Sequence, residues 1–301
     1  MQMIASQGKE WLMKIKRVAL FIIASLLLTL LISPLRGFGY GIKASSLVGF
    51  TVYFVFTLWG IRKSADTLLP SQITLAIVAG LFLLQLPLRI RGFTSSLFSF
   101  PDFVLHFLGI VFGFAFARLH SPQKWLTTVL GFSLALFMFF TGYDLWLHRL
   151  NFGTFTGKVS YTLPAKFEAF DQSKNLVTDK DFANKVILLD FWNTSCGVCF
   201  QKFPQLQKFY EKHKEDAAIS ILAVDAPLED DKEGDAFQAI KEEKYTFPVV
   251  ITKDANLPEL FGITGYPTTF VIDQKGNVVF KGSIEGATKQ VEELLKVRQS
   301  S

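Results

Sequence analysis

Cysteine and histidine are both scarce in this sequence of 301 residues. It contains two cysteines, Cys196 and Cys199, and four histidines, of which only His213 lies in the second half. A structural zinc site needs four ligands, usually two cysteine pairs or a cysteine pair with a histidine pair. These counts argue against such a site, and any sulfur chemistry of the chain belongs to Cys196 and Cys199.

Charged residues are nearly absent from five long apolar runs in the first half. The runs cover residues 18–32, 45–61, 73–88, 103–116 and 125–147. A helix needs roughly 20 residues to cross the hydrocarbon core of a bilayer. The second and fifth runs are long enough alone, and the others reach this length with their flanks. We predict five membrane spans in a helical domain of residues 1–150, with four spans as the alternative.

Two pairs of an acid and a histidine lie near the ends of these runs. Asp102 and His106 fall near the start of the fourth run, and Asp144 and His148 lie at the end of the fifth. Ionisable residues within a membrane often mark functional sites, so each pair is a candidate for an intramembrane proton or quinone site. We favour the simpler interpretation that they are interfacial residues at span ends.

Positive charge is concentrated in the first half. Residues 1–150 carry a net charge of +9, and the remaining residues carry −4. The basic residues are separated by apolar runs and form no continuous stripe, which argues for a lipid bilayer and against nucleic acid as a partner.

The orientation in the membrane follows from the first span. Lys9, Lys14, Lys16 and Arg17 precede it and favour a cytoplasmic N-terminus. No Ala-x-Ala-like cleavage site follows Ile32, so we expect this span to be retained. Five crossings then place the second half outside the cytoplasm. We therefore predict a multi-pass protein of a bacterial inner membrane with a periplasmic C-terminal domain.

The second half has the pattern of an α/β domain. After a linker at residues 151–160, short strand-like runs alternate with helical ones from residue 161 to 301, which favours layers of helices on a sheet. The predicted strands cover residues 166–170, 186–192, 219–224, 248–251, 269–273 and 278–281. The predicted helices begin near Thr178 and Leu257 or cover residues 197–213, 235–244 and 287–297.

The two cysteines form a Cys-x-x-Cys motif where a predicted strand meets a predicted helix. A helix N-terminus stabilises a thiolate through its partial positive charge and free N–H groups. This arrangement favours a dithiol redox motif with Cys196 as the nucleophile. A metal site and an inert buried pair are the alternatives.

Three separated motifs carry a family resemblance. They are Leu189-Asp-Phe-Trp-Asn-Thr-Ser-Cys-Gly-Val-Cys, Pro204 five residues later, and Gly265-Tyr-Pro-Thr-Thr-Phe270. Residues 160–298 with these motifs resemble the TlpA/ResA-like membrane-tethered thiol-disulfide oxidoreductases, which have a thioredoxin fold. The membrane half has no resemblance that we can name.

The resemblance implies catalytic roles for three residues. Cys196 matches the attacking cysteine, and Cys199 matches the resolving one. Asp190 matches the buried carboxylate that assists proton transfer at the resolving cysteine. An exposed acid at the end of a strand is the alternative for Asp190.

The resemblance also implies a client-binding surface. Trp192 matches the aromatic residue that covers the site, although plain core packing explains it equally well. Pro267 matches a proline that follows a cis peptide bond, and such an uncommon bond indicates a recognition surface. Tyr266 before it offers backbone groups to a client. An ordinary trans proline is the alternative.

Three residues depart from the family pattern. Ser195 stands in place of a tryptophan, Val198 in place of a proline, and Lys202 where a glutamate is frequent. We interpret Lys202 as a solvated helix residue. Because such residues tune thiolate stability, they leave the direction of electron flow open.

The resulting functional hypothesis is reduction of disulfides in extracytoplasmic proteins, for example in cytochrome c maturation. The only redox group is the Cys196–Cys199 disulfide, and no cofactor or metal is expected. Since the membrane half has no cysteine, a separate membrane electron donor must re-reduce the pair. The alternatives are an oxidase or isomerase acting in the reverse direction, and a non-enzymatic copper-binding or scaffold protein.

Overall fold

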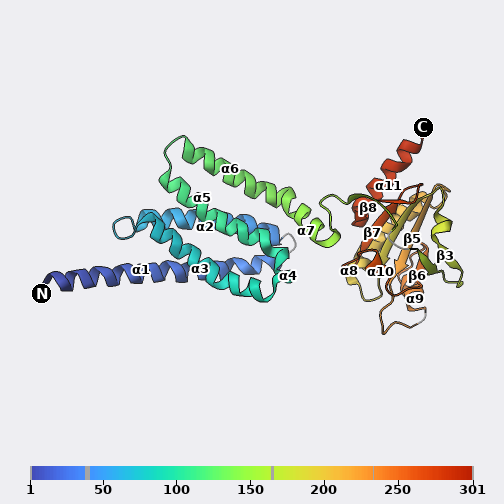
Figure 1. The fold of residues 1–301 in the computed structure, drawn as a ribbon, viewed down its shortest axis with the longest axis horizontal. Helices are drawn as coiled ribbons and strands as arrows, with labels where there is room; N and C mark the ends of the chain where they lie inside the picture. Colours follow the sequence, from blue (N-terminus) through green and yellow to red (C-terminus); the bar gives the residue numbers. More distant parts are fainter. Residues whose placement is uncertain (1, 38–40, 164–165, 233, 300–301) are drawn as a thin grey trace. The chain divides into compact units, whose positions relative to one another are not determined.

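The computed structural model describes residues 2–37, 41–163, 166–232 and 234–299. The chain forms two compact units, Met1–Leu145 and Trp146–Ser301. The first is helical, and the second contains the sheet (Figure 1).

The first unit is built from long apolar helices. Its elements are α1 (Gln2–Ile32), α2 (Gly41–Lys63), α3 (Pro70–Arg91), α4 (Phe93–Ser96), α5 (Phe100–Arg118) and α6 (Gln123–Phe137), with the short helices η1 (Ser33–Gly37), η2 (Leu97–Ser99) and η3 (Met138–Gly142). Within the described residues, five helical stretches are long and apolar enough to cross a membrane. This agrees with the predicted five spans.

Small residues allow α2 and α5 to pack closely. A Cβ atom added at Gly109 would collide with the carbonyl oxygen of Phe50, and one at Gly113 would lie 2.6 Å from that of Phe54. Close backbone approach at small residues is typical of helix packing in membranes. Bulkier residues at these positions are therefore incompatible with the observed packing.

Asp102 and His106, in the first two turns of α5, are both fully buried within the helical unit. The Asp102 carboxylate accepts a hydrogen bond from Arg36 on η1 and one of 3.3 Å from Ser46 on α2. His106 Nε2 lies 3.4 Å from the same carboxylate. The cluster joins the ends of α1, α2 and α5.

The second acid and histidine pair behaves differently. Asp144 is exposed and forms an ion pair of 2.6 Å with Lys43. His148 lies beyond the unit boundary, and its Nδ1 is 2.7 Å from the carbonyl oxygen of Thr154. These two residues do not form a common site.

The second unit contains a mixed sheet with strand order β1-β8-β7-β4-β5-β6-β2-β3. The strands are β1 (Lys158–Thr162), β2 (Glu168–Phe170), β3 (Leu176–Thr178), β4 (Val186–Trp192), β5 (Ile219–Asp225), β6 (Val249–Thr252), β7 (Thr268–Ile272) and β8 (Asn277–Gly282). β4, β5 and β6 run parallel, and the remaining pairs are antiparallel.

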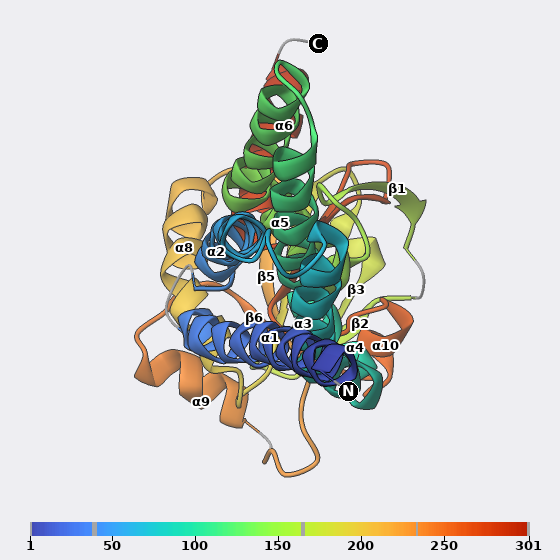
Figure 2. The same ribbon diagram turned by 90° about the vertical axis from the view of Figure 1, so that its left-hand side faces the viewer.

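Apolar cores lie on both faces of this sheet. The first lies under α8 (Gly197–His213), α9 (Asp235–Glu242) and α11 (Ile284–Gln299). The second involves η4 (Asp179–Phe182) and α10 (Leu257–Leu260). Figure 2 shows α8 and α9 on one side of β5 and β6 and α10 on the other. Every residue of β4 is buried, as expected for a central strand covered on both faces.

The predicted elements differ from the structure mainly at the sheet edges. β1 and β3 were not expected, and the helix expected near Thr178 is only the short η4. The linker predicted at residues 151–160 contains the end of α7 (Tyr143–Phe152) and the beginning of β1. β1 is largely exposed, so it lacks the apolar run by which an inner strand is recognised.

Candidate active site

The dithiol lies where the central strand β4 passes into α8. Cys196 is the N-cap of α8, and its sulfur accepts a hydrogen bond of 3.1 Å from the backbone N–H of Cys199. The two cysteines form a disulfide. This places the Cys196 sulfur at the positive end of a helix dipole, which stabilises a thiolate when the disulfide is reduced.

The two cysteines differ in accessibility. Cys196 is half-buried, and Val198 next to it is 53% exposed. Cys199 is fully buried and packs in the core below α8 with Phe203 and Leu206. A client disulfide can therefore reach Cys196 and not Cys199, which supports the order of attack that we predicted.

Asp190 is a buried carboxylate on the α8 side of β4. Leu188 and Trp192, two residues before and after it, belong to the core on that side, and side chains alternate along a strand. Asp190 is 1% exposed, and Thr269 on β7 donates a hydrogen bond of 2.7 Å to its Oδ1. The alternative of an exposed acid at a strand end is therefore wrong.

The environment of Asp190 raises the pKa of its carboxyl above that of an ordinary aspartate. Burial raises the pKa of this carboxyl to about 6, the hydrogen bond from Thr269 opposes the rise, and the negative charge of Glu285 adds to it. A carboxyl with this pKa is largely ionised at pH 7, yet it binds a proton more readily than an ordinary aspartate. It is thus suited to accept a thiol proton.

A small cavity lies beside the dithiol. The Tyr266–Pro267 peptide bond is cis, as predicted. These two residues and Val198 line a cavity of about 290 Å³. Its other lining residues are Asn151, Phe152, Lys202, Thr264, Gly265 and Ser283. The cis-proline loop and the cysteine motif thus form two walls of one groove.

Trp192 does not have the client-contacting role that the resemblance implied. Its side chain is fully buried and packs edge-on against Phe200 and Phe203, with ring centroids 5.8 and 5.1 Å away. A side chain without exposed surface cannot touch a client, so Trp192 supports α8 from below.

Asp225 is a buried acid that our sequence analysis did not name. It is the last residue of β5, it is 1% exposed, and it lies opposite Trp192 in the strand register. Burial and the nearby Asp231 raise the pKa of its carboxyl to about 7. An acid directly after the apolar run 219–224 was the available clue.

Lys202 is a partly exposed residue of α8, consistent with the solvated helix residue that we predicted. It also forms an ion pair with Glu285 in the first turn of α11. The pair connects α8 to α11 next to the groove.

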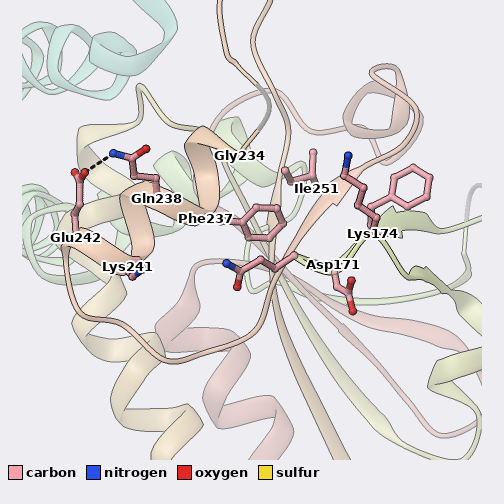
Figure 3. A pocket seen from close by; sticks show the side chains of 10 residues that line it. Asp171, Lys174, Gly234, Phe237, Gln238, Lys241, Glu242 and Ile251 are labelled. Carbon is pink, nitrogen blue, oxygen red and sulfur yellow. Dashed lines mark hydrogen bonds between the residues drawn. The ribbon is translucent and has the colours of Figure 1, made fainter.

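A second, larger cavity of the same unit is separate from the dithiol. It has a volume of about 1060 Å³, and Phe237 of α9 points into it (Figure 3). Its other lining residues are Phe170, Asp171, Gln172, Lys174, Gly234, Gln238, Lys241, Glu242 and Ile251. Since no residue of the cysteine motif or of the cis-proline loop lines it, this cavity is not the redox site.

Comparisons with known proteins agree with this geometry. A family model described as Redoxin matches residues 158–297. The thiol-disulfide oxidoreductase ResA of Bacillus thuringiensis subsp. konkukian is 32% identical over 145 residues, which are 45% of this chain and 82% of that protein. ResA of Bacillus cereus is 34% identical over 117 residues, covering 39% of this chain and 65% of that protein.

Among solved structures, this chain is similar to the thioredoxin domain of a thiol-disulfide oxidoreductase from Bacteroides vulgatus. It is 27% identical with a TM-score of 0.40, and the match covers 45% of this chain and 96% of that domain.

The family match covers the unit that holds the dithiol, and the long apolar helices precede it. The resemblance predicted from three sequence motifs is confirmed. This chain is a thiol-disulfide oxidoreductase that belongs to the TlpA/ResA-like family of the thioredoxin superfamily.

Proposed function

We propose that this protein is a membrane-anchored reductase of disulfides in extracytoplasmic proteins. The observation that carries the proposal is the arrangement of three groups. Cys196 is accessible at the start of α8, Cys199 is buried behind it, and Asp190 is buried on the sheet face that α8 covers. Such an arrangement separates attack on a client from release of the product.

The reaction consists of two exchanges. The Cys196 thiolate attacks a client disulfide, so a mixed disulfide forms and the first client sulfur leaves as a thiolate. Asp190 then accepts the proton of Cys199, whose thiolate attacks the Cys196 sulfur. This step forms the Cys196–Cys199 disulfide and releases the second client sulfur. Two electrons pass from the dithiol to the client, and both client thiolates take up protons.

Each turnover leaves the pair oxidised, so two electrons must return to it. The helical unit has no cysteine and cannot relay them as a dithiol. We therefore propose a separate membrane protein as the electron donor, and the chemistry requires no cofactor besides the disulfide. Oxidised apocytochromes c are one client class that the family resemblance suggests.

Charge distribution in the helical unit supports an outward-facing second unit. The span ends on the N-terminal side carry eight basic residues: Lys9, Lys14, Lys16, Arg17, Arg62, Lys63, Arg118 and Lys124. The opposite ends carry five: Arg36, Lys43, Arg89, Arg91 and Arg149. Of these five, Arg36 and Lys43 are paired with acids. An excess of basic residues marks the cytoplasmic side.

This orientation predicts the labelling of the reduced dithiol in intact cells. A membrane-impermeant thiol reagent should label Cys196 in spheroplasts without permeabilisation, because the domain faces outward. A Cys196→Ser/Cys199→Ser variant provides the blank, since no other cysteine exists. Labelling that requires permeabilised membranes would place the domain in the cytoplasm and contradict the proposed compartment.

A further inference from the structure

The ion pair between Lys202 and Glu285 lies next to the catalytic groups. Lys202 is three residues after Cys199 on α8, so both residues lie on one side of the helix. Glu285 is in the first turn of α11, whose next apolar residues pack in the same core as Cys199. Lys202 also lines the groove beside Pro267.

The helix α11, which carries Glu285, packs against β4, which carries Asp190. The negative charge of Glu285 raises the pKa of Asp190, while the hydrogen bond and charge of Lys202 help to lower that of Glu285 against the effect of its burial. The charged group that acts on Asp190 is Glu285 on α11, and Lys202 on α8 is the ion-pair partner of Glu285. Asp225 on the neighbouring strand β5 lies opposite Trp192, two residues after Asp190.

We propose that Lys202 and Glu285 are positioning residues that set the pH range over which Asp190 accepts the proton of Cys199. Lys202 holds the Glu285 carboxylate in place and offsets its negative charge. Only part of the electrostatic field of Glu285 therefore acts on Asp190. This inference rests on the proposed role of Asp190. Because the pair is partly exposed, salt should weaken its influence.

The charges predict shifts of opposite sign. The acidic midpoint is the pH at which the rate of mixed-disulfide resolution has fallen to half of its maximum. In Glu285→Gln, loss of the negative charge should lower this midpoint by roughly half a pH unit. In Lys202→Gln, the uncompensated Glu285 should move it up by a similar amount. Lys202→Arg keeps the positive charge and should restore the wild-type midpoint. A purely structural ion pair would give two variants with the same direction of change.

The chain offers a matched control in a second ion pair between α8 and α11. Lys212 contacts Glu292, which lies seven residues beyond Glu285, or about 10 Å along the helix axis. Glu292→Gln removes the same kind of contact between the same helices, farther from Asp190. Its midpoint should remain that of the wild type.

The experiment uses the reduced full-length protein in detergent with glutathione disulfide as the probe. Rapid quenching with an alkylating reagent at each pH counts the mixed disulfide and gives the resolution rate. Opposite shifts in Glu285→Gln and Lys202→Gln support the proposal. Unchanged midpoints, shifts in one direction, or an equal shift in Glu292→Gln would overturn it.

Asp190→Asn separates this inference from the proposed function. If that variant loses the acidic midpoint, the role of Asp190 stands, and the ion-pair variants then test the inference alone. If Asp190→Asn keeps the wild-type midpoint, the proposed proton acceptor is wrong, and the inference about the ion pair fails with it.

Discussion

Replacement of Cys199 by serine is expected to trap clients on the protein as mixed disulfides. The accessible Cys196 sulfur can still attack in this variant, whereas no thiol remains behind it to release the product. Turnover should fall by on the order of a thousandfold or more. Non-reducing electrophoresis of the membrane fraction after acid quenching measures the trapped species.

Cys196→Ser is the matched control for this experiment. The remaining Cys199 is fully buried in the core below α8, so it should trap no client, and turnover should be lost equally. Comparable trapping by both variants would show that the accessibility of the two sulfurs in the oxidised structure does not determine which one attacks.

Replacement of Asp190 by asparagine is expected to slow the second exchange and spare the first. An amide of the same shape cannot accept the Cys199 proton, so the resolution rate at pH 7 should fall by roughly a hundredfold. The wild-type resolution rate should decline below about pH 6, where the carboxyl is protonated. The variant should lack this decline. Stopped-flow measurement of both steps tests these expectations.

The same variant should be more stable than the wild type near neutral pH. The pKa of Asp190 is higher in the folded state than in the unfolded chain, so stability is lost as the pH rises from about 4 to about 6. Asparagine removes this cost.

In the kinetic experiment on Asp190→Asn, resolution at the wild-type rate, or a slower first attack only, would mean that Asp190 is a structural acid.

The elements around the dithiol could be predicted because their pattern is local. β4 is a continuous apolar run, and the cysteine motif follows it directly. The turn at residues 273–276, which joins the antiparallel strands β7 and β8, and the start of α8 were predictable for the same reason. The cis bond before Pro267 required the family resemblance, since spacing alone does not specify it.

Contacts between distant residues could not be predicted in this way. Arg36 and Asp102 are 66 positions apart, and Lys202 and Glu285 are 83 apart. Which acid meets which base depends on how the helices pack, and the sequence pattern around Lys202 indicated only an exposed helix face. Asp225 becomes significant through its register with Trp192, which is a property of the folded sheet.

The reduction potential of the Cys196–Cys199 pair in the full-length protein tests the proposed reductase most directly. Since the chain has no other cysteine, alkylation after equilibration in glutathione or dithiothreitol buffers counts this pair alone. We predict a reducing potential near that of thioredoxin, about −270 mV. A value near that of DsbA, about −120 mV, would contradict the proposal and indicate an oxidase.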